Sequence, residues 1–103
     1  MKDNIRDFRR YRTYDCLVIA MLKFCDLVKC RGERSKGICP HRSCVAKKHR
    51  TCVLYARNTV AYCYACHRSM DALEIASQAM GTGYFPAMDE LEILCASALQ
   101  CHT

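Results

Sequence analysis

Two pairs of cysteines in the middle of the chain constrain its fold most. Cys39 and Cys44 are separated by four residues, Cys63 and Cys66 by two, and eighteen residues lie between the pairs. Two pairs at such a distance are typical of a tetrahedral zinc site, because a short hairpin can bring two metal-binding turns around one ion. The sequence therefore predicts one structural Zn2+ per chain, bound by these four cysteines. His41 lies inside the first pair and is an alternative to Cys44 as the second ligand.

Length and targeting signals favour a metal over disulfides. A chain of 103 residues has a core too small to be stable without a cross-link of some kind. Residues 1–15 are charged throughout and lack the apolar centre of a secretory signal. The longest apolar run, residues 17–22, is too short to span a membrane. We therefore expect a cytoplasmic, reduced protein without a membrane partner, in which clustered cysteines bind metal.

The charge is distributed unevenly along the chain. Residues 1–68 contain all 16 Lys and Arg side chains and five acidic ones, a net charge of +11. Residues 69–103 contain five acidic side chains and no Lys or Arg, a net charge of −5. A basic half of this kind suits a polyanionic partner, and it equally suits an ordinary solvated surface.

Hydrophobic periodicity predicts an α+β fold: a small, zinc-ribbon-like antiparallel β-sheet with an N-terminal helix and two C-terminal helices. The first helix is expected from Asp15, with Asp15 as its N-cap. Gly37 is expected to let the backbone bend into the first metal-binding turn. The last two strands form a hairpin that turns at Arg57-Asn58. Strands are expected at residues 27–31, 35–39, 51–56 and 59–64.

The C-terminal part has helical signals. Ser69 or Asp71 can cap a helix that ends at Gly81, and Pro86 suits the first position of a second helix. Asp89, Glu90 and Glu92 would then lie near the positive end of that helix dipole.

The order of these features resembles a known family. The segments FCDLVKCRGERSKGICP, CYAC, MDALEIASQAMG and YFPAMDELE are similar to the Cys-His-Cys-Cys zinc-binding domain of bacterial and phage DNA primases. The likeness covers most of residues 15–99. The matching positions are Leu27, Lys29, Gly32, residues 36–40, Cys63, Cys66, Asp71 and residues 85–88.

The chain departs from this family at one ligand. The family has a histidine two residues after the proline, and here that position is Arg42, which cannot bind zinc. Cys44 lies close to the family's spacing from Cys63, whereas His41 would need a tighter loop. We therefore prefer Cys44 as the second ligand.

The resemblance implies a domain organisation and a function. Residues 1–14 would be a basic N-terminal arm and residues 15–103 a primase-type zinc-binding domain. In primases this domain engages single-stranded template for primer synthesis by a separate catalytic domain. Cations can contact the phosphates and aromatic rings can stack on the bases. The candidate nucleic-acid-binding residues are Lys36, Arg42, Lys47, Lys48, Arg50, Tyr55, Arg57, Tyr62 and Tyr64.

No catalytic constellation is visible in the sequence. Primer synthesis needs acidic residues that hold Mg2+, and the acids after residue 68 lie on predicted helices. We expect a non-enzymatic accessory to DNA replication that binds single-stranded DNA and works with a polymerase, a primase catalytic subunit or a helicase. By family habit it would belong to a phage, plasmid or other mobile element.

The sequence is also compatible with two other functions. The protein can be a zinc-stabilised protein–protein adaptor that docks a polymerase, primase or helicase through its acidic C-terminal helix. Residues 63–67, CYACH, also match the attachment motif of c-type haem, for which His41, His49, His102 or a methionine would be the axial ligand.

Overall fold

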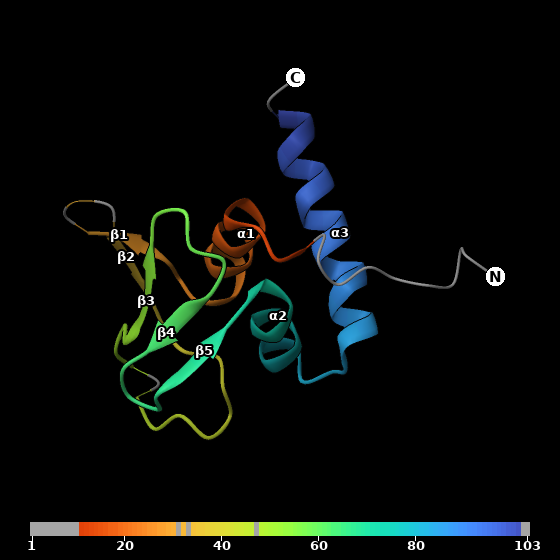
Figure 1. Ribbon diagram of the computed structural model, residues 1–103. Helices are drawn as coiled ribbons and strands as arrows, with labels where there is room; N and C mark the ends of the chain where they lie inside the picture. The colour runs from red at the N-terminus through yellow and green to blue at the C-terminus, as the bar shows by residue number, and fades with distance from the viewer. Residues whose placement is uncertain (1–10, 31, 33, 47, 102–103) are drawn as a thin grey trace.

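Five short strands form one antiparallel sheet, and three helices lie on one side of it (Figure 1). This computed structural model describes residues 11–101 except 31, 33 and 47, with side chains as far as Cys95. The strands follow one another across the sheet in chain order. The predicted α+β fold is therefore confirmed. The elements are α1 (Tyr14–Phe24), β1 (Val28–Lys29), β2 (Arg34–Gly37), β3 (Cys52–Tyr55), β4 (Ala61–Cys63), β5 (Arg68–Met70), α2 (Ala72–Met80) and α3 (Tyr84–Cys101).

The first helix begins one residue earlier than predicted and has a different cap. The side chain of Thr13, not Asp15, accepts a hydrogen bond from the Cys16 amide at 3.1 Å. Before the helix, Tyr11 is buried and its hydroxyl donates to Glu92 of α3 at 3.4 Å. Tyr11 of the predicted arm therefore packs against the domain, Arg12 forms an ion pair with Asp71, and residues 1–10 lie outside the described residues.

The end of α1 packs against β2 at Gly37. The carbonyl of Cys25 accepts a hydrogen bond from the Ile38 amide at 2.6 Å. A Cβ atom on Gly37 would lie 2.9 Å from the Cβ of Cys25 and 3.2 Å from the terminal methyl of Met21. Gly37 is not among the glycines with positive φ. The glycine is therefore needed for close contact between helix and strand rather than for the predicted bend.

Replacing Gly37 by alanine is expected to lower the free energy of unfolding by about 1–3 kcal/mol, because the new methyl group overfills this contact. Gly83→Ala is the matched control, since a Cβ there meets no atom within 4 Å. It should change stability by less than about 0.5 kcal/mol. Denaturant unfolding followed by circular dichroism measures both. Equal losses in the two variants would contradict this account of the packing.

The hairpin between β3 and β4 forms as predicted and turns at Arg57-Asn58. The amide of Asn58 donates to the carbonyl of Tyr55 at 3.2 Å, and Arg57, not Asn58, has the positive φ of 71°. In the sheet register, Val53 is opposite Tyr62 and Cys52 is opposite Cys63. β4 alternates, with Ala61 and Cys63 buried and Tyr62 partly exposed between them, whereas Cys52, Val53 and Leu54 of β3 are all buried.

A fifth strand, β5, was missed by the sequence analysis. It pairs with β4, with Ala61 opposite Met70, and it is the edge strand next to α2. The α2 helix then begins with Asp71, one of the two predicted candidates, as its N-cap, and the Asp71 side chain accepts from the Glu74 amide at 2.8 Å. Gly81 ends α2 in the left-handed conformation, also as predicted. The last helix, in contrast, begins at Tyr84 and not at Pro86.

The core lies between the inward face of the sheet and the helices. Inward side chains from β3 and β4 are buried, as are residues from all three helices. Within the described residues, no helix is long and apolar enough to cross a membrane. Apart from cysteines, the largest fully buried side chains are Leu17, Met21, Leu54, Met70, Ile75, Met88 and Leu91.

Candidate metal centre and sheet face

Four cysteines meet at one end of the sheet. Cys39 follows β2, Cys44 lies in the loop between β2 and β3, and Cys63 is the last residue of β4. Cys66 lies in the turn between β4 and β5. That turn is closed by a hydrogen bond from the His67 amide to the Cys63 carbonyl at 2.8 Å, with His67 in the left-handed conformation. Two connections of the sheet, the β2–β3 loop and the β4–β5 turn, thus bring together the four cysteines that the spacing predicts.

The four sulfur atoms are close enough to share one ion. All four Sγ atoms lie within 4.8 Å of one another. The Sγ atoms of Cys39 and Cys66 are 3.8 Å apart, and those of Cys44 and Cys63 are also 3.8 Å apart. Three of the cysteines are buried and Cys66 is partly exposed. This cluster can therefore hold a metal ion.

The surroundings of Cys63 stabilise a thiolate. Burial raises the pKa of Cys63, but hydrogen bonds from the Thr51 hydroxyl and from the amides of Cys66 and Ala65 outweigh it and lower the pKa to about 6. The Thr51 Oγ1 and Cys63 Sγ atoms are 3.2 Å apart. Burial and the neighbouring Cys63 raise the pKa values of Cys39 and Cys66. A thiolate at Cys63 therefore makes ionisation of a second cysteine in the cluster less favourable. A bound cation would offset this repulsion between negative charges.

His41 is outside this group of ligand atoms. Its Nδ1 accepts a hydrogen bond from the Ser43 amide at 3.1 Å and lies 2.7 Å from the Ser43 hydroxyl. The Cys44 amide donates to the His41 carbonyl at 3.0 Å, which closes a turn that directs the Cys44 thiol inward. The geometry thus places Cys44, and not His41, with the other three cysteines.

Comparisons of this chain with protein-family models, with curated proteins and with solved structures found no match. A four-cysteine cluster in a small antiparallel sheet is consistent with a zinc-binding module.

The other cysteines with described side chains lie outside the cluster. Burial raises the pKa of Cys25 and of Cys52 to about 12, so both remain thiols at neutral pH. Cys16 of α1 and Cys95 of α3 are in contact, with 3.2 Å between their sulfur atoms. Cys25, the C-cap of α1, and Cys52 of β3 are fully buried and serve as small core residues.

The outward face of the sheet presents an aromatic row. Tyr55 of β3 is 43% exposed and Tyr64, just after β4, is 54% exposed. The rings of Tyr62 and Tyr64 meet edge to face at 4.9 Å, and the Tyr62 hydroxyl lies 3.1 Å from Nδ1 of His67. A hydrogen bond from Tyr64 to Tyr55 raises the pKa of Tyr64 and lowers that of Tyr55. We call Tyr55, Tyr62 and Tyr64 the tyrosine row.

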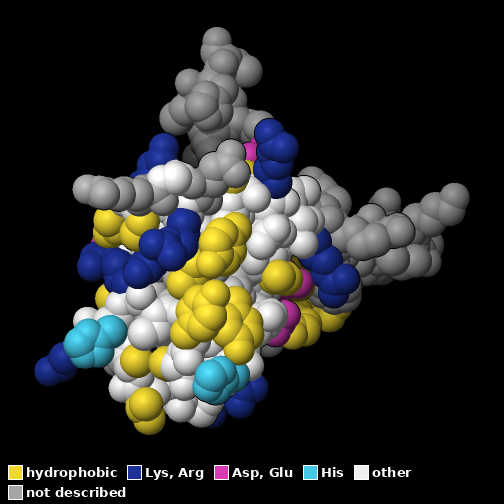
Figure 2. Space-filling model, turned by 60° about the vertical axis from the view of Figure 1, so that its left-hand side comes forward, with side chains coloured by type: hydrophobic (Ala, Val, Ile, Leu, Met, Phe, Trp, Pro, Cys, Tyr) yellow, Lys and Arg dark blue, Asp and Glu magenta, His cyan; other side chains and the backbone are white. Residues whose placement is uncertain are grey.

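Cations border the tyrosine row. Lys36 and Arg34 lie on β2, and the register places Arg34 opposite Tyr55 and Lys36 opposite Val53. Figure 2 looks toward this side of the molecule, where hydrophobic-class side chains, which include tyrosine, gather beside Lys and Arg. Arg34 and His67 were not predicted to belong to this face, because Arg34 meets Tyr55 only through the register of β2 with β3 and His67 meets Tyr62 only across the β4–β5 turn.

The other predicted cations are distributed differently. Arg42, Lys48 and Arg57 are exposed, and Lys47 is outside the described residues. Arg50 is bound by Asp26: its Nε donates to the Asp26 carbonyl at 3.0 Å, and its guanidinium also contacts the Asp26 carboxylate. Arg50 therefore connects the loop before β3 to the end of α1, a structural task that its sequence position did not indicate.

Proposed function

We propose that this protein is a zinc-stabilised module that binds single-stranded nucleic acid on the outward face of its sheet, as a non-enzymatic accessory to DNA replication. The observation that supports this most is the tyrosine row, whose strand register places it on the outward face of the sheet, bordered by Arg34 and Lys36, with Tyr55 and Tyr64 exposed. Single-strand-binding surfaces combine aromatic rings that stack on bases with cations that follow the phosphates. The template for primer synthesis is the single strand that the family resemblance suggests.

Zinc is the metal we propose for the cluster. In a tetrahedron of four sulfurs about 2.3 Å from a zinc ion, neighbouring sulfurs lie about 3.8 Å apart. The two sulfur–sulfur distances of 3.8 Å match that edge. Four protein ligands leave no open position for an activated water, so the zinc would be structural. Catalysis would then belong to a partner: a polymerase, a primase catalytic subunit or a helicase.

The haem alternative has less support. Haem attachment through residues 63–67 would use Cys63 and Cys66 as thioethers, whereas both lie in one cluster with Cys39 and Cys44. Purified protein that contains zinc and lacks a Soret absorption band would favour the zinc proposal over haem.

Replacing Tyr64 by alanine tests the tyrosine row. This ring is the most exposed of the three, so its removal should leave the fold intact. We expect a loss of about 1–3 kcal/mol in binding free energy for a single-stranded oligonucleotide, because base–aromatic stacking is of that size. Binding to duplex should change little, since its bases are already stacked. Fluorescence anisotropy at fixed salt measures both affinities.

Phe85→Ala is the matched control for this experiment. Phe85 is 57% exposed and lies on α3, away from the sheet. It should bind both substrates as the unmodified protein does. Equal losses by Tyr64→Ala for single strand and duplex, or no loss for either, would leave only non-specific electrostatic binding and would count against the proposal.

A further inference from the structure

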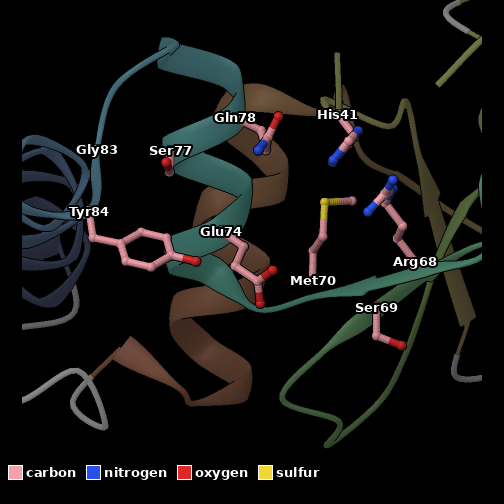
Figure 3. A pocket seen from close by; sticks show the side chains of 9 residues that line it. All are labelled: His41, Arg68, Ser69, Met70, Glu74, Ser77, Gln78, Gly83 and Tyr84. Atoms are coloured by element: carbon pink, nitrogen blue, oxygen red, sulfur yellow. The ribbon is translucent and has the colours of Figure 1, made fainter. Parts of the chain in front are cut away.

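A pocket lies on the helix side of β5, away from the tyrosine row. Its volume is about 370 Å3, which is within the range of small-molecule sites. Its walls come from the loop after β2, from β5, from α2 and from the start of α3 (Figure 3). The Gln78 side chain of α2 accepts a hydrogen bond from the Arg42 amide at 3.5 Å, which holds the loop against the helix. The pocket is therefore built by segments that the tertiary fold fixes.

One end of the pocket has a cation. Arg68 is paired with Cys63 in the β4–β5 register, so its side chain is on the same side of the sheet as the cluster and the helices. In Figure 3 its guanidinium extends into the pocket toward His41. Among the described residues, Arg68 forms no ion pair with a carboxylate. A guanidinium that is not paired with a carboxylate suits a phosphate group, because its planar fork can donate two hydrogen bonds to the phosphate oxygens.

The other end has an aromatic ring and a carboxylate. Tyr84, the first residue of α3, is 47% exposed, and its ring extends toward Glu74 of α2 in Figure 3. Burial and the neighbouring Asp71 raise the pKa of Glu74. Met70 lies between the two ends and presents its sulfur to the pocket. This end offers an apolar and aromatic surface with one hydrogen-bond acceptor.

We propose that this pocket binds a nucleoside monophosphate, with the phosphate at Arg68 and an amino-bearing base between Tyr84 and Glu74. The walls of the pocket favour a ligand with three chemical features: an anion at one end, a flat ring at the other, and a hydrogen-bond donor on that ring. A pocket of this volume suits one nucleotide rather than a dinucleotide.

Two kinds of ligand carry a nucleoside monophosphate group: a free nucleotide and the 5′-phosphorylated end of a single strand. The second source would connect this pocket to the proposed function. β5 is the edge strand of the sheet, so the tyrosine row and the pocket lie on two sides of one narrow edge. A strand lying on the outward face can turn over that edge and place its end in the pocket. The site for the free nucleotide does not depend on the tyrosine row.

Isothermal titration calorimetry of the full chain with AMP, adenosine and inorganic phosphate tests the proposal. We expect saturable one-to-one binding of AMP in the millimolar range or tighter, and weaker binding of either fragment. Arg68→Gln should weaken AMP binding about tenfold, the effect of one charge-assisted interaction. Tyr84→Ala should weaken it by about fivefold or more.

Lys29→Gln is the matched control for lost charge. Lys29 is exposed on β1, at the opposite edge of the sheet, and its replacement should change AMP binding less than about twofold. Tyr64→Ala should also leave AMP binding unchanged, so a failure of the single-strand proposal and a failure of this one are distinguishable. Unchanged circular dichroism and metal content would establish that each variant is folded.

A comparison of oligonucleotides identifies the source. If the pocket takes strand ends, a 5′-phosphorylated oligonucleotide binds more tightly than its 5′-hydroxyl form, and Arg68→Gln removes the difference. If it takes free nucleotides, AMP binds and the two oligonucleotides are equal. The proposal is overturned if AMP does not saturate, if adenosine or phosphate binds as well as AMP, or if Lys29→Gln weakens AMP binding as much as Arg68→Gln does.

Discussion

Removal of the metal by a strong chelator is expected to unfold the domain. The binding free energy of a structural zinc site is about 10–16 kcal/mol, whereas a small domain is stable by only about 5–15 kcal/mol. The cluster joins the β2–β3 loop to the end of β4 and the β4–β5 turn, so its loss releases two connections of the sheet at once. Far-UV circular dichroism should lose its cooperative thermal transition, and added Zn2+ should restore it.

Chelator that has been saturated with Zn2+ is the control for this experiment, since it adds the same molecule without removing metal. Elemental analysis of the untreated protein should give one zinc per chain. A metal-free protein with an unchanged melting temperature would contradict the structural zinc, and the four thiols would then be only neighbouring core residues.

The second large effect is expected when Cys44 is replaced, the cysteine for which the sequence offered His41 as an alternative ligand. Cys44→Ser is nearly isosteric at a buried position and removes one of the four sulfur atoms of the cluster. Replacing a residue that only supports a ligand typically costs 10–100-fold in metal affinity, so loss of the ligand itself should cost more than about 100-fold. Competition against a chromophoric chelator measures this affinity, and the melting temperature should fall with it.

His41→Ala is the complementary variant. It removes the contacts of the His41 ring with Ser43, which are worth about 1 kcal/mol. Metal affinity should stay within about tenfold of the original value, because the ring is outside the cluster. A protein that loses its metal through His41→Ala and keeps it through Cys44→Ser would reverse the assignment of the second ligand.

Local signals in the sequence predicted the presence of the helices and of the cluster, although not the cap of α1 or the start of α3. The cap of α2 at Asp71 and its end at Gly81 depend on residues within a few positions of one another. The spacing of the four cysteines likewise contains most of the information about the cluster, because tetrahedral geometry limits the loops that can supply it. The identity of the second ligand was harder, since both His41 and Cys44 lie in one short loop.

Features that depend on contacts across the sheet were not predictable from the sequence. β5 has only three residues, too few for an alternating pattern to appear. Arg34 joins the edge of the tyrosine row only through the pairing of β2 with β3. Arg50 was assigned to phosphate contact, yet it is bound to Asp26, 24 positions earlier in the chain. In each case the deciding neighbour comes from another element, and no local propensity identifies it.

Nuclear magnetic resonance of the tyrosine rings tests the proposed function most directly. On addition of a single-stranded oligonucleotide to the zinc-loaded protein, the ring protons of Tyr55, Tyr62 and Tyr64 should shift upfield as bases stack on them. The rings of Tyr11 and Tyr14, on the helix side, should shift little. Shifts confined to residues outside the tyrosine row, or no shifts in a mixture whose anisotropy reports binding, would contradict recognition of the strand by this face.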